Sequence, residues 1–233
     1  MGSGGHLRIG ALLFDGLDQI DLTGPFEVLS RIPDSEYRIY AKSMNAVRDT
    51  NGLRLFPDAT LAEAPALDVL HVPGGPGQEE LMEDGEVLGW IKKQAAGASC
   101  VFSVCTGALL LGAAGLLRGR RATTHWASMD LLPYFGARPV ADRVIVDGNM
   151  VLAAGVTAGI DGALRVAANL RGATAAETIQ LAMAYAPEPP FNSGKPETAP
   201  PDVLRAARLS VEELTARRQV TARRVAERLG IDH

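Results

Sequence analysis

The chain has little cysteine, few aromatic residues and no large excess of charge of either sign. Its two cysteines, Cys100 and Cys105, stand on one apolar run and are too far apart along an extended strand to form a disulfide. Thiols that cannot pair are typical of a reducing compartment, so we expect a cytoplasmic protein. No apolar run reaches the roughly 18 residues that a membrane helix needs, and we therefore expect no membrane partner.

Composition and length indicate a globular protein built around one large domain. The formal net charge of −4 argues against a nucleic-acid partner for the chain as a whole. A hydrophobic content of 47% in 233 residues is enough for a sizeable core. We expect a flexible extension over residues 1–6 and an α/β domain over residues 7–186.

Short apolar strands alternate with helical segments along the domain. The pattern predicts strands at 7–14, 37–42, 67–72 and 98–104, and helices at 21–32, 86–96 and 106–117. A further hairpin is expected around Asp147-Gly148-Asn149, and Thr174 with Glu177 has the spacing of a capping box. Strands joined by helices with short links favour a mainly parallel sheet covered on both faces.

The composition changes after Ala186. Residues 187–201 are rich in proline and form the expected connector, and residues 202–233 have the pattern of one or two amphipathic helices. These helices carry many arginines, which suit a solvated helix that packs on the domain or on a partner subunit. A nucleic-acid arm is the alternative, but interspersed glutamates dilute its charge.

Cys105 is the leading candidate for a nucleophile. The buried strand before it and the helix after it place Cys105 on a sharp strand-to-helix turn, which lifts one side chain clear of the sheet. Backbone N–H groups at the start of the helix, beginning with Thr106, can stabilise a thiolate and later an anion on the substrate. The alternative is a buried cysteine that acts as a small hydrophobe.

Other loops can meet Cys105 at the carboxyl ends of the strands, where open parallel sheets bind ligands. Asp21 follows the first strand and can serve either as a proton donor or as the N-cap of its helix. Gly74 and Gly75 follow the strand at 67–72 and either offer N–H donors to a ligand or only form a tight turn. His125, next to Trp126, can act as a base toward Cys105 or simply pack.

Five segments carry a resemblance to a known family. They are Gln19–Pro25, Val72–Gly75, Ser103–Gly107, Ala122–Trp126 and Val156–Asp161. On these segments the chain, from about Leu7 to Pro200, resembles the ThiJ/PfpI superfamily, which has the class I glutamine amidotransferase-like fold. The closest subgroup contains isocyanide hydratases and the ligand-sensing domains of some arabinose-regulator-type transcription factors. Thr106 stands where many members have His, and Asp21 where many have Glu, which weakens any link to the protease-like and glyoxalase-like branches.

The resemblance implies a flavodoxin-like three-layer sandwich, usually a homodimer, without metal or organic cofactor. The implied activity is the hydration of isocyanides to N-substituted formamides. Cys105 is then the nucleophile, Asp21 the general acid and base, and Thr106 an assisting residue. Gly74, Gly75, His125 and Trp126 are expected to bind the substrate or its anion. A sensor of the regulator type needs an output domain of about 100 residues, and too few residues follow Pro201 for one.

Overall fold

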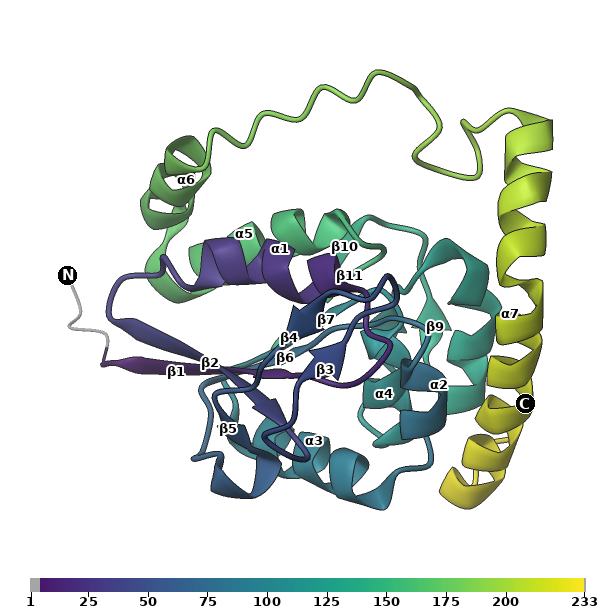
Figure 1. The fold of residues 1–233 in the computed structure, drawn as a ribbon, viewed down its shortest axis with the longest axis horizontal. Coiled ribbons are helices and arrows are strands. Elements are labelled where there is room, and N and C mark those ends of the chain that lie inside the picture. The colour runs from purple at the N-terminus through teal and green to yellow at the C-terminus, as the bar shows by residue number, and fades with distance from the viewer. Residues whose placement is uncertain (1–4, 233) are drawn as a thin grey trace.

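A central sheet organises the protein, seen in the computed structural model shown in Figure 1. Residues 5–232 are described, and within them the main sheet has seven strands in the order β10-β11-β7-β6-β1-β2-β5. Neighbouring strands pair in parallel, except that β10 and β11 pair antiparallel. The strands are β1 (Leu7–Leu12), β2 (Ser35–Ala41), β5 (Ala59–Thr60), β6 (Val69–Val72), β7 (Cys100–Val104), β10 (Val144–Asp147) and β11 (Met150–Ala153). The predicted α/β class with a mainly parallel sheet is confirmed.

Helices cover both faces of this sheet and make three layers (Figure 1). One face carries α1 (Gln19–Leu29), α5 (Ala158–Arg171) and α6 (Ala173–Ala182). The other carries α2 (Gln78–Leu81), α3 (Gly85–Gly97), α4 (Gly107–Ala113) and the 3₁₀ segment η2 (Trp126–Phe135). Each face has its own buried apolar cluster, so the strands of the middle layer are apolar on both sides.

Small elements complete the chain, and some sequence expectations need correction. The strands β3 (Val47–Arg48) and β4 (Arg54–Leu55) form one hairpin, β8 (Arg121–Ala122) pairs with β9 (Arg138–Pro139), and η1 is Leu61–Glu63. The capping box predicted at Thr174 and Glu177 is wrong. Helix α6 starts at Ala173, so Thr174 lies inside the helix, and the N-cap is Gly172, which alone separates α6 from α5 and has a φ of +86°. Within residues 5–232 a capping box forms instead at the start of η1, between Thr60 and Glu63.

The C-terminal segment is one long helix, α7 (Pro201–Leu229). Residues 183–200 contain no helix or strand and lead from α6 to α7 across the molecule (Figure 1). The second half of α7 packs against η2, α2 and α4, where Ala222, Val225 and Ala226 are buried. Of the extension expected at residues 1–6, only residues 5 and 6 are described, and residues 1–4 lie outside the described range.

Candidate active site

Cys105 lies on the turn between β7 and α4, as the sequence predicts. Its φ of +56° falls in the left-handed region, which is strained for a residue with a Cβ atom and is often found at functional sites. Two hydrogen bonds hold the turn: Cys105 N donates to Ala153 O at 2.9 Å, and Thr124 Oγ1 donates to Cys105 O at 2.8 Å. The side chain is buried, with 6% of its surface exposed, so the thiol lies inside the protein rather than on its surface.

Asp21 lies deep in the same site and is not the cap of its helix. Asp18 caps α1 by accepting from Ile20 N, so the capping alternative for Asp21 is wrong. The Asp21 side chain is fully buried, and its Oδ2 accepts from Gly74 N at 3.0 Å. Among the described residues, Oδ1 finds no hydrogen-bond partner of normal geometry. The Cys105 thiol nevertheless acts on this carboxyl group and lowers its pKa.

The electrostatics of Asp21 and Cys105 are coupled. Burial raises the pKa of Asp21 from 3.8 to about 7, with a further rise from the charge of Asp18 and an opposing effect of Gly74 N–H and the Cys105 thiol. Burial and the Asp21 charge also raise the pKa of Cys105 well above its usual value, against Thr106 N–H and the charge of Arg218, which lower it. The carboxyl therefore loses its proton around pH 7, and above that pH the pair holds a single proton.

Thr106, Gly74 and Gly75 form a compact network around the thiol. Gly75 N donates to Thr106 Oγ1 at 3.1 Å, and Thr106 Oγ1 donates to Gly75 O at 3.3 Å. The N–H groups of both glycines are thus bonded to the site side chains Asp21 and Thr106. Their predicted role toward a substrate anion stays a prediction, whereas their part in holding the site together is visible.

Gly74 cannot carry a side chain without disturbing this network. A Cβ atom there would lie 2.5 Å from Thr106 N and 2.7 Å from Thr106 Oγ1. We expect Gly74→Ala to lower stability by about 1–3 kcal/mol through overpacking. Gly89 is the matched control, because it is exposed within α3 and a Cβ atom added there would meet nothing within 4 Å. Gly89→Ala is expected to raise stability by about 0.5–1 kcal/mol, and denaturant melts of both variants check the opposite signs.

His125 lies close to the site as a neutral imidazole. Burial and the nearby Arg218 charge lower its pKa to about 4. Its Nδ1 accepts from Ala127 N at 3.4 Å, and its ring stands 5.1 Å from that of Trp126. Contact of His125 and Trp126 with a substrate stays a prediction. Across residues 5–232, no group of three or more His, Cys, Asp or Glu side chains is arranged to hold a metal ion.

Two residues that the sequence reasoning did not single out also touch the site. His71 in β6 is fully buried, its Nε2 lies 3.1 Å from the backbone oxygen of Asp21, and its Nδ1 lies 2.7 Å from Tyr37 Oη. Because a carbonyl only accepts, Nε2 is the donor and Nδ1 accepts from Tyr37. Burial lowers the pKa of His71 to about 3, so this chain of bonds holds Asp21 with a neutral ring. The second residue is Arg218 of α7, whose Nη2 donates to Gly75 O at 2.8 Å.

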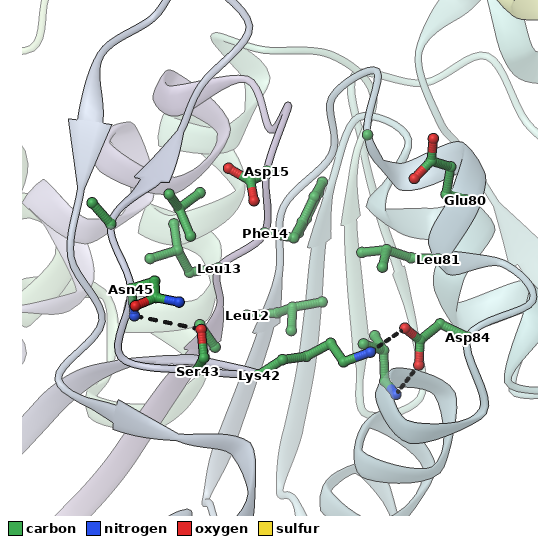
Figure 2. A pocket seen from close by; sticks show the side chains of 15 residues that line it. Leu12, Leu13, Phe14, Asp15, Lys42, Ser43, Asn45, Glu80, Leu81 and Asp84 are labelled. Atoms are coloured by element: carbon green, nitrogen blue, oxygen red, sulfur yellow. Dashed lines mark hydrogen bonds and ion pairs between the residues drawn. The ribbon is translucent and has the colours of Figure 1, made fainter.

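A separate groove lies on the α2 and α3 side of the domain. It has a volume of about 330 Å³ and is lined in part by Phe14, Asp15 and Glu80. Figure 2 shows Lys42 reaching across it to Asp84, with Nζ and Oδ2 2.7 Å apart. None of the site residues around Cys105 lines this groove. The groove and the Cys105 site are therefore distinct features.

Fold and site together define a class of protein. A parallel sheet with a strained cysteine on a strand-to-helix turn, facing a buried carboxyl, is an elbow-type cysteine site on an α/β sandwich. The chain belongs to the DJ-1/PfpI family, whose family model matches residues 7–169. Among the described residues, no helix is both long and apolar enough to cross a membrane.

Individual relatives extend the match beyond the family model. Isonitrile hydratase of Pseudomonas putida is 50% identical over 222 residues, which cover 95% of this chain and 97% of that protein. The crystal structure of a ThiJ/PfpI family protein from Pseudomonas syringae has a TM-score of 0.91 and 41% identity, covering 94% of this chain and 91% of that one. A helix-turn-helix-type transcriptional regulator of Pseudomonas aeruginosa is 30% identical over 161 residues, covering 66% of this chain and 44% of the regulator.

Proposed function

We propose that this protein is an isonitrile hydratase, which adds water to an isonitrile (the same compound as an isocyanide), R–N≡C, and releases an N-substituted formamide. The observation that carries the proposal is the buried Asp21 carboxyl, with a pKa of about 7, beside the strained Cys105 thiol. This pair combines a nucleophile with a group that exchanges protons at neutral pH. The near full-length similarity to the Pseudomonas putida enzyme supports the same reaction.

In the first half of the proposed reaction, Cys105 Sγ attacks the terminal carbon of the isonitrile. A C–S bond forms while Asp21 gives its proton to the same carbon, and the product is a thioimidate, R–N=CH–S, on Cys105. The N–H of Thr106 acts on the sulfur and lowers the pKa of the thiol, so it stabilises the thiolate that attacks. Because the Asp21 carboxyl is fully buried, bulk water does not reach the proton that it delivers.

In the second half, ionised Asp21 takes a proton from water as the water oxygen attacks the thioimidate carbon. That proton passes to the nitrogen, giving a tetrahedral adduct with one hydroxyl group. The C–S bond then breaks, the hydroxyl proton returns to the Asp21 and Cys105 pair, and the formamide leaves. One water is consumed, and the enzyme regains its starting protons, so no cofactor enters the balance.

The pair predicts a definite pH dependence. Below pH 7 both Asp21 and Cys105 hold a proton, and the reactive form with one shared proton is depleted. We expect kcat/KM to fall about tenfold per pH unit below 7 and to level off above it. His125, with its pKa of about 4, stays neutral across this window and does not contribute. A pH–rate profile from 5 to 9 that is flat through pH 7 would contradict this assignment.

Direct turnover is the test of the proposal. The purified protein is incubated with an alkyl isonitrile, and the formamide proton is followed by NMR. Formamide that accumulates beyond one equivalent supports the hydratase. The similarity to the regulator makes a small-molecule sensor the second candidate, and binding of the isonitrile without any formamide would favour that sensor.

We further propose that the protein works in the cytoplasm as a homodimer on small isonitriles. Both cysteines are free and buried, which suits a reducing compartment. Large apolar side chains are exposed on α6, the connector and α7: Leu181, Phe191 and Leu209. A second copy that covers them would remove apolar surface from water. Light scattering is expected to give twice the chain mass of 24.6 kDa, and a monomer mass would contradict the dimer.

A further inference from the structure

Arg218 reaches from the C-terminal helix into the heart of the cysteine site. Its side chain is buried, with 5% of its surface exposed, although it lies between exposed stretches of α7. Nη2 donates to Gly75 O at 2.8 Å and to Thr106 Oγ1 at 3.4 Å, and Nε donates to Gln78 Oε1 at 3.1 Å. The guanidinium group thus binds the backbone at Gly75 and the side-chain hydroxyl of Thr106, the residue that follows Cys105.

The three acceptors of Arg218 are neutral oxygens, which is unusual for a buried guanidinium. A buried charge is costly unless an opposite charge compensates it. The negative groups that act on Arg218 are Cys105, in its thiolate form, and Glu79 of α2. Glu79 Oε1 accepts the hydroxyl of Thr221, one turn further along α7. The other negative group is the thiolate of Cys105, whose charge Arg218 stabilises when the thiol ionises.

We propose that Arg218 is a positioning residue of the Cys105 site, which α7 inserts to fix Thr106 and Gly75 and to compensate the negative charge of the Cys105 thiolate. Its relevance to catalysis rests on the proposed hydration. The effect reaches the thiol through space and through Thr106. Helix α7 is therefore part of the site rather than a packing element alone.

Other charged groups around the site define what the test must separate. Asp21 and Asp18 act on Cys105 from the start of α1 and raise the pKa of its thiol, while Arg218 lowers it. The charge of Arg217, on the same helix, lowers the pKa of Arg218. The charge of Arg218 in turn lowers the pKa of His125 at the start of η2. Loss of the Arg218 charge leaves only Thr106 N–H in favour of the thiolate. The pKa of Cys105 must then rise.

Residues 7–169 are those that the family model matches, and α7 lies beyond them. Cys105 and Asp21 lie within the matched part, whereas Arg218 does not. The near full-length similarity to the Pseudomonas putida enzyme does extend over 95% of this chain. The Cys105 site thus combines residues inside the family match with Arg218, which lies outside it.

The test measures the reactivity of Cys105 without any isonitrile. The rate of Cys105 alkylation by iodoacetamide is followed against pH by mass spectrometry in Arg218→Met, Arg218→Lys and the unchanged protein. We expect Arg218→Met to slow alkylation at pH 8 at least tenfold and to move its midpoint to higher pH. Arg218→Lys keeps the charge but not the forked donors, so alkylation should recover while kcat for hydration stays reduced.

Arg224 provides the matched control on the same helix. Its Nε and Nη2 bind Glu83 at 2.9 and 2.6 Å on the surface, so Arg224→Met weakens the docking of α7 without changing the charge at Cys105. Alkylation in this variant should follow the unchanged protein. An unshifted profile in Arg218→Met, or an equal shift in Arg224→Met, would overturn the proposal.

A variant that fails to fold does not end the test. Arg218→Gln keeps an amide donor for Gly75 O but loses the charge, and we expect the same shift in midpoint as for Arg218→Met. An unshifted midpoint in a folded Arg218→Gln would also overturn the proposal. Alkylation uses no isonitrile. If the unchanged protein does not hydrate isonitriles, the proposed function is wrong, but the effect of Arg218 on the reactivity of Cys105 is still measured.

Discussion

Replacement of Cys105 by alanine is expected to abolish isonitrile hydration, with a loss of at least about 10⁴-fold in turnover, while the protein stays folded. Alanine removes the only sulfur at the strand-to-helix turn, and no covalent thioimidate can form. The backbone bonds of the turn, to Ala153 O and from Thr124 Oγ1, do not depend on the thiol. Steady-state formamide production and a thermal melt of the variant check both parts. Turnover at the rate of the unchanged protein would exclude covalent catalysis by Cys105.

Cys100 offers the matched control. It is also buried, in β7, and burial raises its pKa to about 12, but the site does not use it. Cys100→Ala is expected to retain turnover and to lose only packing energy, on the order of 1 kcal/mol. A turnover loss in Cys100→Ala equal to that in Cys105→Ala would point to a packing effect of the strand.

The φ of +56° at Cys105 adds a stability measurement to this series. Glycine adopts that conformation without strain, whereas alanine incurs the same penalty as cysteine. We expect Cys105→Gly to be about 1 kcal/mol more stable than Cys105→Ala, and both to be inactive. Equal stability of the two would mean that the turn relaxes when the thiol is removed.

The second large effect is expected at Asp21. Asp21→Asn should lower turnover by about 10²–10⁴-fold, because an amide cannot exchange the proton that the thioimidate step needs. Asp21→Glu keeps the carboxyl group and should retain part of the activity, although the extra methylene enters a fully buried site. Kinetics of both variants decide the matter: an Asn variant as fast as the unchanged protein would make Asp21 structural.

Stability gives an independent signature of the same carboxyl. Because the folded pKa of about 7 lies above the ordinary 3.8, ionised Asp21 destabilises the folded state. This cost is absent below about pH 4, grows as the pH rises to about 7 and reaches on the order of 4 kcal/mol above it. Asn carries no charge, so Asp21→Asn should lose less stability than the unchanged protein between pH 4 and 8. Parallel pH dependences of the two melting temperatures would contradict the raised pKa.

The sequence predicted the framework of the site because that framework is local. A strand followed by a helix places Cys105 on a turn, and the carboxyl ends of parallel strands bring Gly74 and Asp21 to the same edge. The structure bears out this convergence through the bond from Gly74 N to Asp21 Oδ2. The resemblance added the chemistry, since spacing alone does not distinguish a nucleophile from a buried thiol.

Residues that act through distant packing could not be predicted in this way. Arg218 and Arg217 are adjacent on one amphipathic helix, yet the Arg217 side chain is 60% exposed and Arg218 is buried. The docking angle of α7 on the domain decides which arginine enters, and that angle depends on contacts across the whole chain. The contact of His71 with Asp21 could not be predicted for a different reason: a lone histidine in an apolar strand belongs to no sequence pattern.

The position of α7 in the chain also sets an order of events during synthesis. A ribosome makes Cys105 and Thr106 long before Arg218, and at roughly 5–20 residues per second the gap lasts about 5–20 s. The sheet and its turn can form in that interval, but the side chain that binds Gly75 O and Thr106 Oγ1 has not yet been made. The nascent chain thus passes through a stage in which the turn at Cys105 lacks the hydrogen bonds from Arg218, and these bonds form only when α7 docks.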